Sequence, residues 1–133
     1  MVVCIGATIG KVGLTVEDNG ATNQQCNSVI PKGKVSAEFL FYSMLLRAPA
    51  LPLLAGRAAV PIVNKSNFCD FKVPVAPLPE QREIAAQLAA VDAKLAAEES
   101  RRAALAAMFQ SLLHFLLTGR VRLPEFAGGH TAL

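Results

Sequence analysis

The longest regular feature of the sequence is the stretch from Pro77 to Leu117, which is predicted to form a single uninterrupted helix. Apolar residues recur along it at alternating steps of three and four residues. At about 1.5 Å of rise per residue, the helix is on the order of 60 Å long, roughly twice the width of a small domain. A helix of this length cannot bury its own apolar stripe, so we expect it to pair with another helix.

The apolar stripe has the spacing of a heptad seam with a polar centre. If two copies pair antiparallel about a two-fold axis near residue 100, Glu98 meets Arg102 of the other copy and every other layer is apolar. A parallel pair would set like charges together, which costs stability. We therefore predict antiparallel pairing, with a second copy or with a homologous helix. The alternative is a helix that folds back on its own head, but the length of the helix argues against it. The predicted seam comprises Ile84, Leu88, Val91, Leu95, Glu98, Arg102, Leu105, Phe109, Leu112 and Leu116.

Both ends of the helix carry recognisable signals. Pro79 precedes Glu80 and Glu83, whose negative charges complement the positive end of a helix. Gly119 is predicted to end the helix in the left-handed conformation. These limits predict a head at residues 1–76, a spacer or dimerisation helix at 77–119 and a tail at 120–133 whose last residues fray.

The head is predicted to be a small α+β unit of short strands with one or two short helices. Ser36 is a good N-cap for a helix over residues 37–46, and a helical turn is expected near residues 53–55. Asn64 to Asn67 are typical of a turn or a cap. Strands are expected at Val2–Ile5, Leu14–Val16, the end of the stretch 21–30, Val60–Val63 and Phe71–Ala76, with a hairpin turn at 17–20.

The composition favours a chain that hides apolar surface in a folded core or against a partner. Hydrophobic residues make up 53% of the chain and the mean hydropathy is +0.40, which argues against disorder. The apolar run from Ala103 to Leu117 contains Gln110 and His114 and is shorter than the roughly twenty residues that a membrane span needs. Because the N-terminus also lacks a basic signal-peptide region, we expect a cytoplasmic protein that does not enter a membrane.

The basic excess lies on the head. The net charge is +3 and the pI near 9.0, and residues 1–78 contain seven Lys or Arg against four acids, which permits a nucleic-acid partner. Asn and Gln amides can pair bidentately with an adenine edge, whereas Lys and Arg neutralise phosphates and Arg also reads guanine. The DNA-contact candidates are Lys11, Asn23, Gln24, Gln25, Arg57 and Lys65. The alternative for the three amides is an ordinary polar turn that satisfies its own backbone.

The sequence predicts no catalytic, cofactor-binding or metal-binding residue. Residues 6–11 (GATIGK) have one residue too few between the glycines for a phosphate loop, and Val12 follows the lysine where Ser or Thr is needed. The three cysteines are widely spaced, which is typical of reduced thiols. An enzyme of unknown type is therefore the weakest of the alternatives.

Several stretches together resemble the DNA-specificity (S) subunits of type I restriction–modification systems. The similar features are Pro77 to Gln81 followed by Ile84 and Leu88, Thr118-Gly119 with Arg122, and residues 56–63 (GRAAVPIV), 36–42 (SAEFLFY) and 5–13 (IGATIGKVG). S subunits carry two recognition domains, each followed by a long helix, and the two helices pack antiparallel as a spacer.

The resemblance implies a non-catalytic subunit that reads one half of a bipartite target in double-stranded DNA. Separate modification subunits would bind the methyl donor and methylate adenine, and a restriction subunit would translocate and cleave. It also implies that the head is the later part of a target-recognition domain. The alternative is an assembly protein whose helix binds modification subunits or a full-length specificity subunit without reading DNA.

Overall fold

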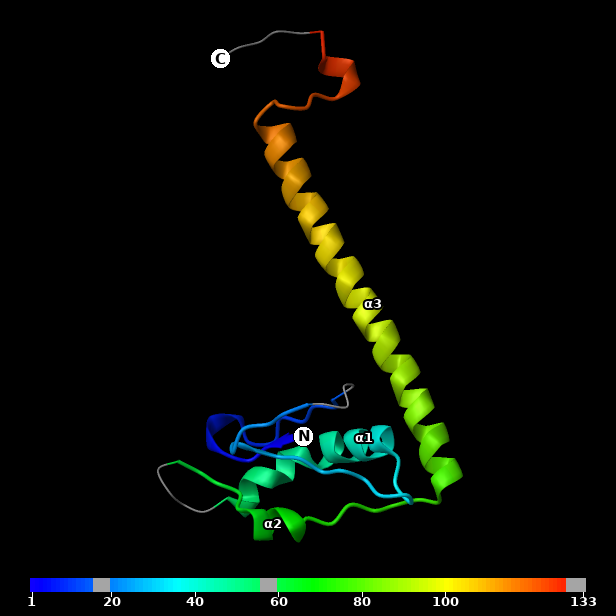
Figure 1. Cartoon of the computed structure of the whole chain (residues 1–133). Helices are drawn as coiled ribbons and strands as arrows, with labels where there is room; N and C mark the ends of the chain where they lie inside the picture. The colour runs from blue at the N-terminus through cyan, green and yellow to red at the C-terminus, as the bar shows by residue number, and fades with distance from the viewer. Residues whose placement is uncertain (16–19, 56–59, 129–133) are drawn as a thin grey trace. The chain divides into compact units, whose positions relative to one another are not determined.

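The computed structural model describes residues 1–15, 20–55 and 60–128 (Figure 1). The chain divides into two compact units, Met1–Ala89 and Ala90–Leu133. The first unit contains the head and the opening turns of the long helix α3 (Leu78–Leu117), and the second contains the rest of α3 and the tail. The boundary at Ala89 shows that α3 begins as a part of the head.

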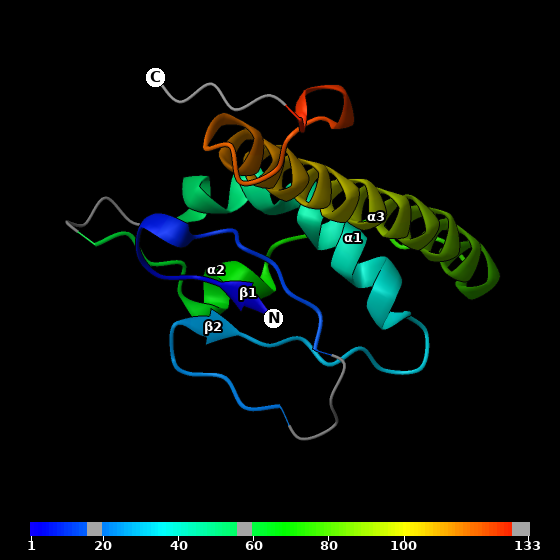
Figure 2. The same cartoon turned by 90° about the horizontal axis from the view of Figure 1, so that it is seen from above.

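The head contains a minimal antiparallel sheet. Strand β1 (Val2–Val3) pairs with β2 (Cys26–Asn27), so that Val2 lies opposite Asn27 (Figure 2). Isolated bridges join Val2 to Val12 and Ile5 to Ile62. The predicted strands near residues 2–5, 21–30 and 60–63 are therefore present in place, but only as two-residue strands or single bridges.

Two predicted strands need correction, and a third feature lies outside the described residues. Leu14 and Thr15 form no strand, because the pairing of this segment with β1 ends where the Gly13 N–H donates to the Met1 carbonyl at 2.9 Å. Residues 71–76 also form no strand: Pro74 lacks a backbone donor, and Phe71 and Val73 pack on the core without a neighbouring strand. Val16 and most of the hairpin turn predicted at 17–20 fall among the residues that are not described.

The helices of the head begin at side-chain caps. Helix α1 (Ala37–Arg47) is capped by Ser36, whose Oγ accepts from the Phe39 N–H at 3.3 Å, which confirms the predicted helix and its cap. A 3-10 helix (Ala48–Leu54) follows directly and is longer than the predicted turn. Helix α2 (Lys65–Cys69) is capped by Asn64, whose Oδ1 accepts from the Asn67 N–H at 2.8 Å, so the predicted cap opens a short helix.

The core of the head lies between α1, its 3-10 continuation and the β1 segment. Leu51 is fully buried at its centre. Gly10 has a φ of +94°, and a Cβ there would lie 2.8 Å from the Ala48 carbonyl oxygen, so the loop can approach the end of α1 only with glycine. The buried core residues are Val2, Cys4, Met44, Ala48, Leu51 and Val63, with Ile9, Val12, Leu40, Leu54, Phe68, Phe71 and Val73 packed around them.

The stretch Ala37–Leu54 is, by length and composition alone, apolar enough to cross a membrane. It consists of α1 and the 3-10 helix, and three of its side chains, Met44, Ala48 and Leu51, belong to the core of the head. Pro52 lies inside its second half. We therefore assign this stretch to the core of the head.

Helix α3 is continuous over 40 residues, which confirms the predicted long helix. Gly119 has a φ of +70° and its N–H donates to the Leu116 carbonyl at 3.2 Å, as predicted for the helix end. A short 3-10 helix, Pro124–Phe126, follows in the tail. The described chain is thus predominantly helical with little strand. The predicted long helix is confirmed, whereas the short strands of the head agree with the predicted α+β class only in part.

Candidate nucleic-acid interface and helix seam

Gln81 joins the opening turn of α3 to the head. Its side chain is 0% exposed, and its Oε1 accepts a hydrogen bond from the Ser36 N–H at 2.8 Å. Its Nε2 donates to the carbonyls of Lys34 at 2.9 Å and Ala76 at 2.7 Å. A buried amide with both ends satisfied fixes the two chain segments that it bridges.

Sequence reasoning places Gln81 within the Pro77–Gln81 motif but assigns it no role. The sequence nevertheless indicates that Gln81 is buried. It precedes Ile84 by three residues and Ala85 by four, so it lies on the same helix face as the apolar stripe that continues to Leu88. An uncharged polar residue on an apolar stripe, with charged neighbours on either side in the sequence, is typical of a buried hydrogen-bonding position.

Ser36 links the helix cap to this junction. While its backbone N–H donates to Gln81, its hydroxyl donates to Glu38 Oε2 at 2.6 Å and accepts from the Phe39 N–H. The hydrogen bond from Ser36, followed by one from the Glu38 backbone N–H, lowers the pKa of the Glu38 carboxyl. The carboxylate also lies in the first turn of α1, where the helix dipole favours negative charge.

The three candidate amides lie in the turn that precedes β2. The Oδ1 of Asn23 accepts from the Gln25 N–H at 3.0 Å, and the Asn23 carbonyl accepts from the Cys26 N–H at 3.2 Å. The Gln25 carbonyl in turn accepts from the Cys4 N–H at 2.9 Å, which holds the turn against the β1 segment. Asn23 thus satisfies the backbone of its own turn, whereas the side chains of Gln24 and Gln25 are exposed.

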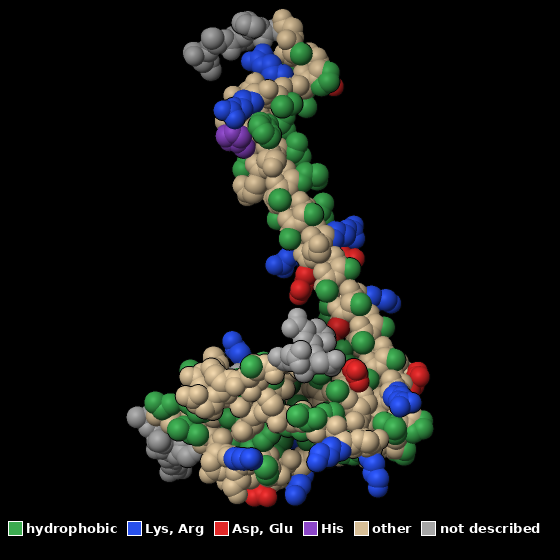
Figure 3. Space-filling view, in the orientation of Figure 1, with side chains coloured by type: hydrophobic (Ala, Val, Ile, Leu, Met, Phe, Trp, Pro, Cys, Tyr) green, Lys and Arg blue, Asp and Glu red, His purple; other side chains and the backbone are tan. Residues whose placement is uncertain are grey.

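The candidate cations occupy different parts of the head. Lys65 is exposed at the first residue of α2, two residues after Val63, whose N–H donates to the Cys4 carbonyl at 2.8 Å. Backbone pairing at Cys4 therefore brings the segment before α2 close to the turn that contains Gln25. Lys11 lies elsewhere, in a shallow depression beside Ala48, and Arg57 is outside the described residues. Lys and Arg side chains gather along the lower edge of the head in Figure 3.

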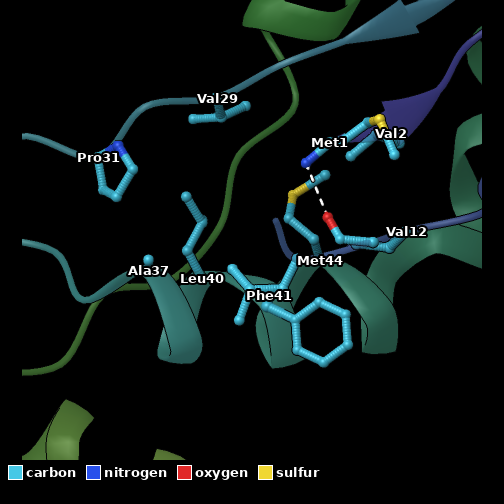
Figure 4. A pocket seen from close by; sticks show the side chains of 11 residues that line it. Met1, Val2, Val12, Val29, Pro31, Ala37, Leu40, Phe41 and Met44 are labelled. Carbon is cyan, nitrogen blue, oxygen red and sulfur yellow. Dashed lines mark hydrogen bonds between the residues drawn. The ribbon is translucent and has the colours of Figure 1, made fainter. Parts of the chain in front are cut away.

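The pocket drawn in Figure 4 is apolar and small. Its walls include Val2, Leu40 and Met44, and its volume is about 40 Å³. At its edge the amino group of Met1 donates to the Gly13 carbonyl at 3.0 Å. Ligand clefts usually enclose about 300 Å³ or more, so this space suits a few water molecules at most. Within the described ranges, no group of three or more His, Cys, Asp or Glu side chains could hold a metal ion.

The predicted seam lies along α3 with its apolar side chains largely uncovered. Ile84 is half-buried in the head, and every described residue from 90 to 128 is exposed. At the polar centre, Glu98 contacts Arg101 of its own helix at 3.5 Å, with both side chains about 70% exposed. An exposed ion pair of this kind contributes little, so exchanging Arg101 for a cation of another helix costs little.

The sequence of most of the chain matches a known family. Residues 1–107, which include the head and most of α3, match the family described as the type I restriction modification DNA specificity domain, and the chain belongs to that family. The resemblance noted in the sequence is thereby confirmed.

Among curated proteins, the chain is similar to the putative specificity subunit of the type I restriction enzyme MjaX of Methanocaldococcus jannaschii. The two are 30% identical over 91 residues, which is 68% of this chain and 21% of that protein. The chain therefore spans about a fifth of the length of the relative. No solved structure shows significant similarity to the chain.

Proposed function

We propose that this chain is a cytoplasmic DNA-reading component of a type I restriction–modification complex, and that it has no catalytic activity of its own. The observation that carries the proposal is the extent of the family match, which includes both the head and α3 as far as residue 107. In this proposal the head contacts double-stranded DNA, and α3 sets the position of the head within the complex.

The proposed DNA-reading surface consists of Gln24, Gln25 and Lys65, which are exposed on the two segments that pair with the backbone of Cys4. Gln24 and Gln25 each present a donor and an acceptor, the combination that recognises an adenine edge in the major groove. Lys65, carried on the segment that pairs at Cys4, supplies a cation for a phosphate. Lys11, which lies elsewhere on the head, would add to its positive field, and Arg57, outside the described residues, would add one more positive charge.

The proposed role of α3 is antiparallel pairing with a second copy or a homologous helix. The exposed apolar seam supports pairing, and the order of Glu98 and Arg102 favours the antiparallel direction. Such a pair places two heads at opposite ends of a spacer. Each base pair occupies about 3.4 Å of duplex, so the spacer would separate two half-sites by several base pairs.

Catalysis is proposed to come from partners. A modification subunit would methylate the DNA that the head has selected, and a restriction subunit would join the wider complex. The test is selection from a random duplex library by the full chain, alone and with a modification subunit. We expect enrichment of one bipartite sequence, with Gln24→Ala/Gln25→Ala losing it. Equal recovery of all sequences in both conditions would contradict DNA reading.

An assembly protein is the second candidate. The observation that favours this function is the hydrogen bond within the turn at Asn23. The Asn23 side-chain oxygen accepts from the backbone of the same turn, as in an ordinary polar turn. In this case α3 would bind a modification or specificity subunit and the head would contribute nothing to DNA binding. Capture of a modification subunit that depends on Leu95 and Leu105 but is unaffected by DNA or by Gln24→Ala/Gln25→Ala would support this function.

A further inference from the structure

We propose that an apolar groove on the head is the docking site for the C-terminal end of α3 and the tail of a second copy of this chain. The inference rests on the proposed antiparallel pairing and deepens it. It gives the pair a second contact surface, outside the helix seam.

The groove lies within the first unit, between α1 and the opening turns of α3. Its volume is about 450 Å³, and its lining is almost entirely apolar. Leu46 is 82% exposed at its edge, and Leu45 beside it is nearly half exposed. Apolar grooves of this kind are typical of protein-binding sites. The lining residues are Phe39, Tyr42, Ser43, Leu45, Leu46, Ile84 and Leu88.

The groove is continuous with the predicted seam. Ile84 and Leu88 line the groove and are also the first two seam positions. In an antiparallel pair centred near residue 100, Leu116 of the second copy faces Ile84, and Leu112 of the second copy faces Leu88. The register that matches the seam thus directs the end of the second α3 to the groove.

The chain segment that arrives there carries the apolar side chains to fill it. Leu117, at the last position of α3, is largely exposed. Gly119 then turns the chain away from the helix axis, and Val121, Leu123 and Phe126 of the tail are each more than half exposed. Because the tail leaves the helix, these three side chains can reach beyond the seam toward the groove edge at Leu45 and Leu46.

Charges at the two surfaces are complementary. Glu80 and Glu83 lie at the beginning of α3, close to the groove in sequence, and Arg120 and Arg122 lie in the tail. The same register sets the last turn of the second copy's α3 opposite the first turns of α3 that carry these acids, and Arg120 follows three residues after Leu117. Exposed pairs of this type add little affinity but favour one orientation over others.

The proposed occupant belongs to another chain. Leu88 and Leu116 are about eight turns apart along α3, and in the antiparallel register each faces the other end of the second helix. A second copy supplies the end of α3 without any bend in the helix. The groove would therefore be covered only in the dimer.

The absence of tryptophan from the sequence allows a direct test with the full chain. Leu46→Trp places a single reporter at the exposed edge of the groove. At concentrations where light scattering shows a dimer, we expect its emission to shift to shorter wavelength and its quenching by acrylamide to fall. Adding Leu123→Ser/Phe126→Ser should reverse both effects while the dimer persists. Glu125→Ser, a polar change in the same tail, is the matched control and should change neither.

Each other outcome contradicts the proposal at a defined point. A dimer in which the tryptophan reporter stays as accessible as in the monomer overturns groove docking but leaves helix pairing intact, whereas a monomer at every concentration overturns both. A monomeric Leu95→Asp variant must expose the reporter, because burial there would mean that its own chain fills the groove. Leu45→Trp provides a second reporter if the first variant fails to fold.

Discussion

The backbone N–H of Ser36 donates to the side-chain oxygen of Gln81 at 2.8 Å, so the residue that caps α1 is also held by the first turn of α3. The same amide binds the carbonyls of Lys34 and Ala76 through its nitrogen. Two segments of the head, one at Lys34 and Ser36 and the other at Ala76, are therefore joined by one buried side chain.

Gln81→Glu is expected to destabilise the head strongly at neutral pH. The substitution keeps the shape but replaces the NH₂ group with an oxygen that faces two carbonyl oxygens. Leaving buried polar groups unpaired costs about 1–3 kcal/mol each, and more for a charge. A protonated carboxyl restores one donor, so the loss should shrink as the pH falls. Thermal unfolding of the variant at neutral and acidic pH measures this.

Gln87→Glu is the matched control for this substitution. Gln87 lies on the same helix, and its amide makes only an exposed contact with Glu83 at 3.1 Å. We expect a change of a few tenths of a kcal/mol there. If Gln81→Glu and Gln87→Glu lower the free energy of unfolding equally, the buried hydrogen bonds of Gln81 do not stabilise the head.

Ser36→Ala should lower the free energy of unfolding of the head by about 1 kcal/mol, because it removes the side-chain cap of α1. Chemical denaturation with circular dichroism measures the change. Ser66→Ala, which alters an exposed serine in α2, should have little effect. An equally small effect at Ser36 would argue against the cap.

The Ser36–Glu38 hydrogen bond also predicts a dependence on pH. Because the pKa of Glu38 is lowered in the folded chain, its contribution is present above the pKa of glutamate in an unfolded chain, about 4.3. That contribution is lost as the pH falls through the lower pKa of the folded state. Glu38 is exposed, so the effect is small. On acidification the free energy of unfolding should fall more for the wild type than for Glu38→Gln. When both proteins also carry Ser36→Ala, this difference between them should be smaller.

Leu51→Ala should destabilise the head by about 2–5 kcal/mol, because it leaves a cavity at a fully buried site. Leu53→Ala makes the same change in the same 3-10 helix at a side chain that is 84% exposed. We expect that control to stay within about 0.5 kcal/mol of wild type. Guanidinium denaturation of both variants provides the comparison.

Glu98→Arg should weaken self-association about tenfold or more, because an antiparallel pair would then meet Arg102 with a like charge at both symmetry-related positions. Glu98→Arg/Arg102→Glu should restore the dimer. Glu99→Arg makes the same change of charge outside the predicted seam and should have a smaller effect. Sedimentation or light scattering over a range of concentrations distinguishes these variants. If the double variant does not dimerise, the predicted pairing of Glu98 with Arg102 is wrong.

In the DNA-reading function, Lys65→Ala and Gln25→Ala should differ in kind. Removing a phosphate contact should weaken binding to all sequences and reduce the slope of the affinity with salt by about one charge. Removing an amide should reduce discrimination between sequences and leave the salt slope unchanged. Binding isotherms at several salt concentrations separate the two effects.

Local signals predict the helices well, because their causes lie close together in the sequence. The cap at Ser36 and the helix end at Gly119 depend on neighbouring residues alone. The prediction of a strand at 71–76 is wrong, because a strand requires a partner that local propensity does not supply, and Pro74 removes a donor.

The hydrogen-bond geometry around the candidate residues is harder to predict from the sequence than the helices are. The self-capping role of Asn23 can be anticipated only as an alternative, since a short polar turn can serve its own backbone or a ligand. The role of Gln81 depends on Lys34 and Ser36, more than forty positions away. Contacts at that separation cannot be read from a single sequence without its fold.

The partners of the Gln81 side chain are all main-chain atoms, belonging to Lys34, Ser36 and Ala76. The three hydrogen bonds of this junction therefore require a backbone path and one glutamine, and they use no other side chain of the head. Exposed residues of the head can change without loss of these bonds. The attachment of the head to α3 by hydrogen bonds is thus independent of the surface that the head presents.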